Sequence, residues 1–463
     1  MKNRKLPNPS ARELAVKTLF QWLQKEPGDR GEIEDLANAF LLKSSLSSRD
    51  KALYWQLVFG TIRWLRLLKY HLKRYLKKFS KLPLKVQVIL YIGAYQIIFL
   101  SKIPFFSAVD ESVKLAKRFR FNWAKGLINA SLRALSRGSK KIILKEEDVQ
   151  SYCNENFLNC LSNLTSHPYW MVKRWYEQWD KAKCINICIN NNIQSSLCIR
   201  VNNLKITTSE LIKIFEKQGI NAKKGLIAEN SLRIFNYKGS VEKLPGLNEG
   251  LFQVQDESSQ LAVELLNPLP GEKILDVCAG IGGKTTYIAQ LVGDEAEIIA
   301  TDINIRRLKK LQENVKRLGI KSISAYHLEQ GYNKIISKAP FDKILIDAPC
   351  SGFGVIRRHP DIKWNRTPNA IAELSKIQLD LLNKWSTCLK EGGLLLYCVC
   401  TMEREETDEV IKAFLKKNKK FSLVSLDKAS KTRPKDIFLN RTLRIFPGQY
   451  DMDGFYGALL KKH

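Results

Sequence analysis

The sequence predicts a protein of three parts: an all-α domain over residues 1–140, a small α+β segment over 141–250 and an α/β domain over 251–463. In the first part, apolar residues recur at every third and fourth position, which is typical of helices. In the last part, short apolar runs alternate with helical stretches, which indicates a doubly wound, mainly parallel sheet. A chain of 463 residues is also too long for one hydrophobic core.

The helical spacing of the first part is clearest in three stretches: Ala11–Leu23, Leu53–Leu68 and Val109–Leu135. Ser48-Arg49-Asp50 has the residues of a helix start, and Pro104 predicts a break. Five or more helices are therefore expected. The longest apolar run, Val86–Leu100, is too short to span a bilayer and predicts a buried helix.

The net charge of the chain is +30, and it is unevenly distributed. Residues 1–140 carry a net charge of +19, and residues 61–140 hold 18 Lys and Arg against 2 Asp and Glu. Such an excess predicts a nucleic-acid partner. The alternative is a helical bundle with a cationic surface and no partner. The residues expected on the basic face are Arg63, Arg66, Lys69, Lys73, Arg74, Lys77, Lys78, Lys81, Lys114, Lys117, Arg118 and Arg120.

The middle part is nearly balanced in charge and predicts a mixture of helices and strands. The expected elements are a helix at Trp170–Trp179, a strand at Ser196–Val201, a helix at Ser209–Gln218 and a strand at Arg233-Ile234-Phe235. Pro245-Gly246 and Gly250 then mark a turn-rich exit.

The last part alternates strands and helices. Strands are predicted at Lys273–Val277, Glu297–Asp302, Lys343–Asp347 and Leu394–Cys398. Helices are predicted at Ser258–Leu266, Lys284–Leu291, Ile305–Leu318, Ala370–Leu389 and Glu405–Lys416. Ligands of such sheets bind outside the carboxyl ends of the strands, so the residues that follow each strand are candidates for the site.

Residues 274–285 read Ile-Leu-Asp-Val-Cys-Ala-Gly-Ile-Gly-Gly-Lys-Thr, which predicts a strand, a glycine-rich turn and a helix start. Glycines let a ligand approach the backbone, and a helix N-terminus offers free N–H groups to an anion. The spacing is not that of a P-loop, so hydrolysis of a nucleoside triphosphate is disfavoured.

The next predicted strand ends at Asp302, whose carboxylate can accept both ribose hydroxyls of an adenosine cofactor. The cofactor would be NAD or S-adenosylmethionine, and Lys284 would pair with the methionine carboxylate of the latter. The alternative role for Asp302 is a helix N-cap.

Two further strands run into short cysteine-containing segments, Asp347-Ala-Pro-Cys350-Ser-Gly and Tyr397-Cys-Val-Cys400-Thr. Two cysteines and a carboxylate would thus point at one site. A thiolate that adds to C6 of cytosine produces an enamine, whose C5 attacks a sulfonium methyl group. An acid near N3 assists, and a base then removes the C5 proton before the thiolate leaves.

The alternative interpretation of these cysteines is that they are small buried hydrophobic residues. This interpretation fits Cys388, Cys398 and Cys278. It fits Cys350 and Cys400 less well, because each of these follows a strand directly and begins a turn.

Several segments resemble the RNA cytosine-C5 methyltransferases of the Sun/RsmB type, and the resemblance covers nearly the whole chain. The most specific match is Asp347–Trp364. The others are Gln253–Gln260, Cys400-Thr401 with Glu405-Glu406, Phe446-Pro447-Gly448, Asp453-Gly454-Phe455 and, for a NusB-type RNA-binding domain, Lys51–Arg66 and Gly126-Leu127-Ile128-Asn129.

The resemblance implies a NusB-like domain, a Rossmann-like methyltransferase domain and methylation of C5 of a cytosine in 16S ribosomal RNA with S-adenosylmethionine as cofactor. It assigns Cys400 as the nucleophile, Cys350 as the residue that assists release and Asp347 as the partner of N3. The residues that it assigns to the donor are Cys278, Ala279, Gly280, Ile281, Gly282, Gly283, Lys284, Asp302, Gln330 and Asp347.

The chain departs from the family pattern at two positions. Ile281 stands where the family usually has proline, so the loop lacks the restraint that proline places on φ. Gln330 stands near a family aspartate that reads the adenine amino group, and either Gln330 or Glu329 would accept that hydrogen bond.

Arg357, Arg358, His359 and Lys363 follow the Asp-Ala-Pro-Cys turn and are candidates for contacts to RNA. The alternative is a structural ion pair of one arginine with Asp361. For the whole chain, the competing functions are a non-catalytic RNA-binding assembly factor, an NAD-dependent enzyme and a methyltransferase of transfer RNA or of another ribosomal position.

The remaining expectations concern compartment and assembly. Met1-Lys2-Asn3-Arg4-Lys5 is not followed by an apolar core, so no signal peptide is expected. The 10 cysteines form no regular framework, which suggests reduced thiols in a cytoplasm. Cys184 and Cys188 lack a second ligand pair, so no metal is expected. We expect a monomer with no membrane partner.

Overall fold

The computed structural model describes residues 9–138, 147, 149, 153, 156–237, 239–426 and 433–463. The expected boundary between the first two parts, at residues 140 and 141, lies outside these ranges. By backbone contacts the chain forms two compact units. Unit 1 comprises residues 1–192 and 359–367, and unit 2 comprises residues 193–358 and 368–463.

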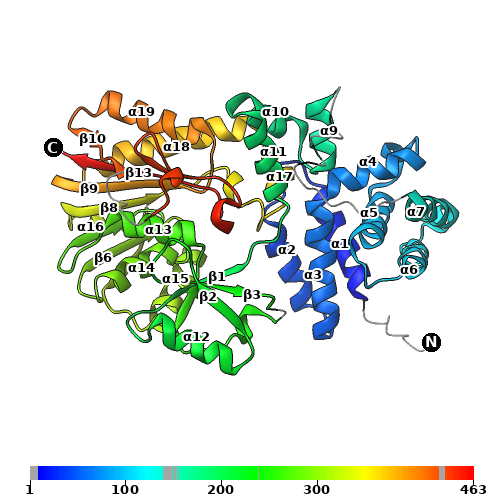
Figure 1. The fold of residues 1–463 in the computed structure, drawn as a ribbon, viewed down its shortest axis with the longest axis horizontal. Helices are drawn as coiled ribbons and strands as arrows, with labels where there is room; N and C mark the ends of the chain where they lie inside the picture. Colours follow the sequence, from blue (N-terminus) through cyan, green and yellow to red (C-terminus); the bar gives the residue numbers. More distant parts are fainter. Residues whose placement is uncertain are drawn as a thin grey trace. The chain divides into compact units, whose positions relative to one another are not determined.

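Unit 1 is built from helices, as the apolar spacing predicted (Figure 1). Its first helices are α1 (Ala11–Leu23), α2 (Ile33–Leu42), α3 (Ser48–Arg63), α4 (Leu65–Tyr75), η1 (Phe79–Lys81), α5 (Leu84–Phe99), α6 (Phe105–Arg118), η2 (Asn122–Ala124) and α7 (Lys125–Gly138). Helix α5 is apolar on almost every side and is buried from Val86 to Gln96, with α1, α3, α4, α6 and α7 packed against it. A helix of this composition is stable only as the centre of a bundle.

Two of the three predicted helical stretches are interrupted in the structure. The stretch Leu53–Leu68 is divided at Trp64, which leaves the helical conformation between α3 and α4. The stretch Val109–Leu135 is divided after α6, where Arg120 takes a left-handed conformation with φ 65° and the chain reverses. Apolar spacing continues across both breaks because the flanking helices face the same core.

Unit 1 also contains α9 (Phe157–Leu164), α10 (Tyr169–Gln178), α11 (Lys181–Asn190) and the short α17 (Ile362–Asn365). The Trp364 indole donates to the carbonyl of Ile62 at 2.8 Å, and Lys363 Nζ donates to the carbonyl of Arg63 at 2.7 Å. Residues 359–367 therefore belong to the helical unit, although the chain on either side belongs to unit 2.

Unit 2 contains a small antiparallel sheet in the order β2-β3-β1-β4. Its elements are β1 (Leu197–Val201), α12 (Thr208–Lys217), β2 (Asn221–Lys224), β3 (Ser231–Phe235), η3 (Val241–Lys243) and β4 (Phe252–Val254). Phe215 of α12 packs edge-on against Phe252 of β4, with ring centroids 5.9 Å apart. The α+β character predicted for the middle of the chain is confirmed here.

The larger sheet of unit 2 has the order β11-β12-β13-β9-β8-β5-β6-β7. Five strands run parallel: β5 (Lys273–Asp276), β6 (Glu297–Asp302), β7 (Ile323–His327), β8 (Phe341–Asp347) and β9 (Leu389–Val399). The antiparallel strands are β10 (Phe421–Leu423), β11 (Phe438–Leu439), β12 (Thr442–Ile445) and β13 (Phe455–Lys462).

Helices cover both faces of this sheet (Figure 1). One face carries α13 (Glu257–Leu266), α14 (Gly283–Leu291) and α15 (Ile305–Leu318), and the other carries α16 (Tyr332–Ile336), α18 (Pro368–Ser386) and α19 (Asp408–Lys417). Leu345 contributes to the first core and its neighbours Ile344 and Ile346 to the second, as strand alternation requires. The remaining short helices are η4 (Phe353–Val355), η5 (Arg404–Glu406), η7 (Lys435–Ile437) and η8 (Gln449–Asp451).

The strand order reverses between β5 and β8, because the chain runs outward from β5 to β7 and then crosses back to β8 and β9. Such a switch point opens a crevice at the carboxyl ends of the two strands. The glycine-rich loop begins at residue 277, directly after β5, and the Ala-Pro-Cys turn begins at residue 348, directly after β8. These two segments therefore meet at the switch point.

Two further facts bear on the sequence expectations. Cys153 and Cys160, seven positions apart in the chain, form a disulfide with a Cα separation of 5.5 Å, so the prediction of reduced thiols is wrong for this pair. Within the described ranges, no helix has the length and apolar character needed to cross a membrane.

Candidate active site

The glycine-rich loop after β5 is fixed by hydrogen bonds to the neighbouring strand and helix. Ala279 N donates to the carbonyl of Thr301 at 2.8 Å, and Gly280 N donates to Asp302 Oδ2 at 2.9 Å. The carbonyl of Ile281 accepts from Asn314 of α15 at 3.0 Å. These bonds restrain the loop although Ile281 stands where the family has proline.

Gly282 is the glycine of this loop for which the structure gives a steric reason. Its φ is 85°, and a Cβ atom at this position would lie 2.9 Å from Cγ of Leu311. Any side chain here would be strained and would push against α15. The loop can therefore turn into α14 only because residue 282 is glycine.

Asp302 closes the loop from the side of β6. Its Oδ2 accepts from Gly280, and its Oδ1 accepts from Asn304 N at 2.7 Å. The N-cap of α15 is Asn304, whose side chain accepts from the backbone of Arg306 and Arg307. The capping alternative for Asp302 is therefore not what the structure shows, and its carboxylate lies beside the loop at the switch point.

Lys284 and Asp347 connect the loop to the end of β8. Lys284 Nζ donates to Asp347 Oδ2 at 2.6 Å, and the side chains are 10% and 32% exposed. Burial disfavours the ammonium ion, but the charge of Asp347, the hydrogen bond to it and electrostatic interactions with Cys398 and Cys400 together outweigh burial and raise the pKa of Lys284. The lysine expected to meet a methionine carboxylate thus has a carboxylate partner within the protein.

Cys350 and Cys400, which are both half-buried, lie against each other. Cys350 Sγ and Cys400 Sγ are 3.3 Å apart, although 50 residues separate them in the chain. Interaction with Cys400 and burial both raise the pKa of the Cys350 thiol well above its ordinary value, so Cys350 stays protonated. Cys400 lies within electrostatic reach of the Lys284 ammonium group.

Of the other cysteines near this edge, Cys398 is buried, in agreement with the hydrophobic interpretation, whereas Cys278 is half-buried. Cys398 is fully buried on β9, its Sγ lies 3.6 Å from Asp347 Oδ1, and burial raises its pKa. Burial likewise raises the pKa of Cys278 in the loop. Neither thiol is suited to nucleophilic attack.

Glu406 holds the two cysteine turns together. Its Oε1 accepts from Ser351 N at 2.8 Å, and its Oε2 accepts from the Ser351 hydroxyl. That hydroxyl also lies 2.9 Å from the hydroxyl of Thr401, and Gln378 donates to Glu406 Oε1 at 3.0 Å. Because Ser351 follows Cys350 and Thr401 follows Cys400, this network fixes the spacing of the two thiols.

Glu406 itself belongs to a pair noted in the sequence, but its partners were not foreseen. Burial raises its pKa, although the hydrogen bonds from Ser351 oppose this effect. Ser351 and Thr401 adjoin the cysteines, so their positions were a signal. Gln378 lies in the middle of α18, and nothing in the sequence indicated that it would contact Glu406.

The arginines after the Asp-Ala-Pro-Cys turn are bound to carboxylates. Arg357 pairs with Asp451, and Arg358 pairs with Asp453 and, at 2.8 Å, with Asp256. The alternative of a structural arginine–carboxylate pair is confirmed, but Asp361 is the wrong partner, because the carboxylates come from the loop before β13 and from the start of α13. Arg357 and Arg358 thus join distant segments of unit 2.

The other two candidates for RNA contacts, His359 and Lys363, belong to unit 1. Lys363 is buried, and burial lowers its pKa well below the ordinary value. Its amino group donates to two oxygens within that unit. A phosphate contact through Lys363 is therefore wrong.

Gln330 and Glu329 lie in the loop after β7, and both are exposed. Gln330 N donates to His327 Nδ1 at 3.4 Å. The register pairs Asp302 with His327, so this loop begins at the same edge of the sheet as the Asp302 carboxylate.

Asp276, at the end of β5, carries the most displaced carboxyl pKa near the loop. Complete burial raises its pKa to about 7, although Thr285 donates to its Oδ2 at 2.6 Å. Its Oδ1 is buried without a hydrogen-bond partner. A protonated carboxyl group suits this position, because it removes the charge that burial penalises.

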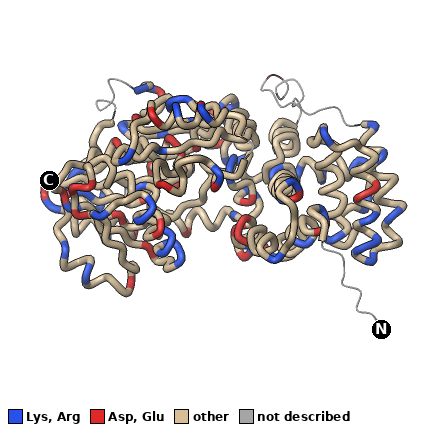
Figure 2. The backbone as a smooth tube through the Cα atoms, turned by 90° about the horizontal axis from the view of Figure 1, so that it is seen from below, with Lys and Arg blue, Asp and Glu red and all other residues tan. Residues whose placement is uncertain are grey.

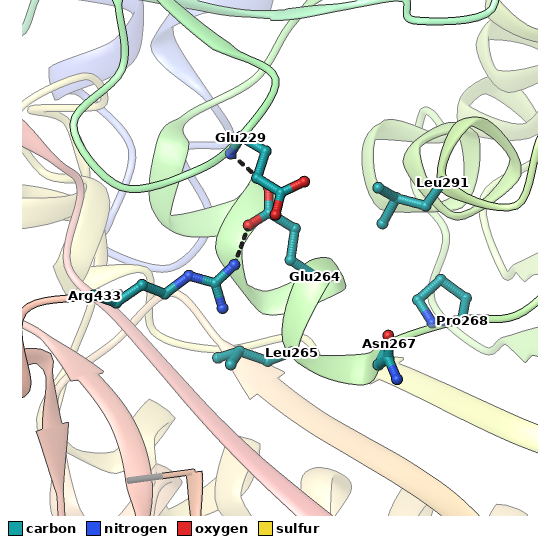
Figure 3. Close-up of a pocket in the computed structure, with 7 residues that line it drawn as sticks. All are labelled: Glu229, Glu264, Leu265, Asn267, Pro268, Leu291 and Arg433. Carbon is teal, nitrogen blue, oxygen red and sulfur yellow. Dashed lines mark hydrogen bonds and ion pairs between the residues drawn. The ribbon is translucent and has the colours of Figure 1, made fainter. Parts of the chain in front are cut away.

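A separate cavity of about 420 Å³ lies at the opposite edge of the sheet (Figure 3). It is lined by Glu229, Glu264, Leu265, Asn267, Pro268, Leu291 and Arg433. Glu264 accepts from Tyr287, from the backbone of Glu229 and from Arg433, so its oxygens are already engaged. The reactive groups gather at the carboxyl edge, and we place the site there rather than in this cavity.

The described part of the chain offers no group of side chains able to hold a metal ion. Cys184 and Cys188 are buried on α11, and the Cys184 thiol points to the carbonyl of Val172.

A doubly wound sheet with a glycine loop, a carboxylate at the end of the next strand and two cysteines in contact at the carboxyl edge is the arrangement expected of an α/β methyltransferase rather than of a dehydrogenase. Comparison with known proteins agrees. The family model described as 16S rRNA methyltransferase RsmB/F matches residues 263–461. The NusB family model matches residues 9–137, and the RsmF/B-like ferredoxin-like domain model matches residues 167–240.

Curated relatives match this chain over nearly its whole length. A probable ribosomal RNA small subunit methyltransferase B of Bacillus subtilis is 33% identical over 457 residues, which cover 98% of this chain and 99% of that protein. The ribosomal RNA small subunit methyltransferase B of Proteus mirabilis is 35% identical over 434 residues, or 91% of this chain and 92% of that protein. The chain therefore belongs to the RsmB family of ribosomal RNA small-subunit methyltransferases, which confirms the resemblance found in the sequence.

A solved structure supports the same fold. A methyltransferase homologue from Pyrococcus horikoshii is 29% identical, with a TM-score of 0.58, and covers 67% of this chain and all of its own. NSun6 from the same organism, solved with SFG, has the same TM-score at 23% identity, which shows the fold alone.

Proposed function

We propose that this protein methylates C5 of one cytosine in small-subunit ribosomal RNA, with S-adenosylmethionine as methyl donor and a covalent bond between Cys400 and C6 of the base. The approach of Cys350 and Cys400 to 3.3 Å, beside the Lys284–Asp347 pair, is the observation that carries the proposal. A dehydrogenase has no use for two opposed thiols at the cofactor edge.

The residues at the switch point fit S-adenosylmethionine. In this proposal, Asp302 accepts the ribose hydroxyls, Gln330 or Glu329 reads the adenine, and the loop of residues 278–284 receives the methionine part. The open space beside Gly283, which has one atom within 4 Å of an added Cβ, leaves room for a ligand. When bound, the donor supplies an electrophilic methyl group on a sulfonium sulfur.

Cys400 performs the first step. Its thiolate adds to C6, and the electrons of the C5–C6 double bond move to C5. C5 then forms a bond to the methyl group while the bond from that group to the sulfonium sulfur breaks, and the electron pair of the broken bond stays on sulfur, which leaves as the thioether S-adenosylhomocysteine. Loss of the C5 proton to a base and departure of the Cys400 thiolate restore the double bond. Lys284 stabilises the thiolate because its ammonium group is held at the same edge by Asp347.

Asp347 and Cys350 have separate roles. Asp347 stands at the end of β8, where its carboxyl group hydrogen-bonds N3 and holds the ring as charge develops during the addition. Cys350 remains a neutral thiol because of its raised pKa, so it does not compete for C6. It lies in contact with Cys400 and assists release of the methylated base.

RNA binding falls to the basic helices of unit 1, on which Lys and Arg are dense (Figure 2). Some predicted residues have structural partners: Arg66 donates to Asn163, and Arg118 pairs with Glu13. Exposed residues without an ion pair to a described carboxylate continue along α4 and η1: Lys69, Lys73, Arg74, Lys77, Lys78 and Lys81. We assign these six to phosphates of the RNA.

The test is methylation of small-subunit ribosomal RNA by the purified protein with labelled S-adenosylmethionine, followed by bisulfite mapping. One protected cytosine is expected. Replacing Lys69, Lys73 and Lys77 by glutamine should weaken RNA binding and flatten its dependence on salt, because each lost phosphate contact releases about one counterion fewer. Methylation of transfer RNA alone would overturn the assignment of substrate.

A further inference from the structure

We propose that Gln255, oriented by Arg200, donates a hydrogen bond to the carboxylate of the methionine part of the methyl donor. This inference rests on the proposed function, because it adds a residue pair to the donor site. Neither residue belongs to the loop of residues 278–284 or to the strand ends that carry the cysteines.

Arg200 reaches the start of α14 from the small sheet. It is fully buried, and its guanidinium stacks on the ring of Tyr287 at 4.8 Å. It donates to the carbonyl of Gly283 at 2.6 Å and to the hydroxyl of Thr286 at 2.9 Å. The Arg200 guanidinium, which extends from β1, is thus hydrogen-bonded to the first turn of α14.

None of the groups that accept a hydrogen bond from Arg200 is a carboxylate: the other two are the side-chain carbonyls of Gln290 and Gln255. Burial lowers the pKa of Arg200 to about 9. A helix N-terminus is also electropositive, so a buried cation beside it repels the helix dipole. An anion that binds at this point would offset both the burial of the Arg200 charge and its repulsion by the helix dipole.

Gln255 supplies an unused donor at the same point. Its Oε1 accepts from Arg200, so its amide Nε2 must face the other way. The side chain is 7% exposed, and Nε2 is buried without a hydrogen-bond partner. Nε2 is also the atom within 4 Å of a Cβ built on Gly283, so it lies beside the first turn of α14.

The carboxylate is the group that this arrangement selects. S-adenosylmethionine carries one anionic group, and a carboxylate accepts hydrogen bonds without donating any. Lys284, the nearer cation of the helix start, is already paired with Asp347. The free N–H groups of the first turn and Nε2 of Gln255 are therefore the donors left for it.

The chain provides a matched control two residues away. Gln253 is also 7% exposed, and its Oε1 accepts from another arginine, Arg317. Gln253→Ala therefore removes a buried glutamine and one bond to arginine, as Gln255→Ala does. Gln253 lies on β4 opposite Arg200 and makes its bond to α15, away from the helix start.

The experiment compares two ligands by titration calorimetry on the full chain. S-adenosylhomocysteine has the carboxylate, and 5′-methylthioadenosine lacks the whole amino-acid part. Gln255→Ala should raise the Kd of the first about tenfold, the loss expected for a hydrogen bond to a charged group, and change the second less than twofold. Gln253→Ala should change neither, and Arg200→Lys should fall between wild type and Gln255→Ala.

An unchanged Kd for S-adenosylhomocysteine in Gln255→Ala would overturn the inference. An equal loss for both ligands would also overturn it, since the defect would then be structural. If the wild-type protein binds neither ligand, the proposed cofactor is wrong, and the inference, which depends on that cofactor, is wrong as well. If the wild type binds both ligands but Gln255→Ala weakens them equally or not at all, only the inference is wrong and the proposed function stands.

Discussion

The two edges of the large sheet carry similar ionisable groups but arrange them differently. At the amino edge, Glu264, Tyr287 and Arg433 satisfy one another around the cavity of Figure 3. At the carboxyl edge, Lys284 pairs with Asp347, whose side chain is 32% exposed, and the two thiols of Cys350 and Cys400 face each other at 3.3 Å. A closed set of hydrogen bonds stabilises the fold, whereas an open set retains capacity for a substrate.

The sharpest test of this contrast is removal of the sulfur at Cys400. Cys400→Ala should lower methyl transfer by more than about 1,000-fold, because no other group can form the bond to C6. Binding of S-adenosylhomocysteine should change less than twofold. Initial rates with labelled donor and calorimetry measure the two quantities, and substantial turnover by the variant would contradict the assignment.

The second thiol should give the opposite phenotype. Cys350→Ala should still form the bond to C6 but release the product slowly, so a covalent protein–RNA complex should accumulate. The complex would appear as a slow band on a denaturing gel, absent from the double variant with Cys400→Ala. Without that band, Cys350 would be a packing residue only.

Two buried glutamates allow the edges to be compared directly. Glu406→Gln should lower kcat about 10-fold to 100-fold, because the network that spaces the two thiols loses an acceptor oxygen. Glu264→Gln breaks a comparable set at the amino edge and should cost about 1–3 kcal/mol of unfolding free energy with kcat changed less than twofold. Equal losses of kcat would mean that the edges do not differ in function.

The smallest effect concerns pH and stability. Burial raises the pKa of Asp276 to about 7 in the folded protein, against 3.8 ordinarily. The folded state therefore holds a proton that the unfolded chain has released, and the stabilisation, complete below about pH 4, is lost as pH rises towards 7. Between pH 5 and 8, Asp276→Asn should lose less stability than wild type in urea titrations.

Asp453 must be considered in that measurement. Burial raises its pKa to about 7 as well, with Asp256 adding to the shift and Arg358 opposing it. Wild type and Asp276→Asn share this contribution, so it cancels in the comparison. Parallel curves for the two proteins would show that Asp276 is ionised in the folded state.

Four of the five parallel strands, β5, β6, β8 and β9, could be predicted because each contains a short apolar run followed by a turn. The helix at Ile305–Leu318 was predicted to the residue, since its apolar positions and its glycine stop agree. Strand β7 and the antiparallel strands after residue 420 were missed. They are short or begin directly after turns, and long-range pairing with β6 and β9 stabilises them.

The candidate site divides in the same way. The cysteines, Asp347 and the loop stand at strand ends, where residue type and position are both visible in the sequence. The roles of Arg200 and Gln255 could not be predicted from the sequence, because they depend on contacts between the small sheet and the elements of the large sheet. Arg357 and Arg358 resembled RNA ligands until their carboxylate partners, about 100 residues away, were known.

The placement of residues 359–367 in unit 1 has a consequence for dissecting the molecule. The chain passes between the two units after residues 192, 358 and 367, so residues 359–367 of unit 1 are inserted in the sequence of unit 2. A gene fragment that begins at residue 193 would strand Trp364 and Lys363 without Ile62 and Arg63. A complete helical unit therefore requires residues 359–367 as well as residues 1–192, so experiments on either unit are best made on the full chain.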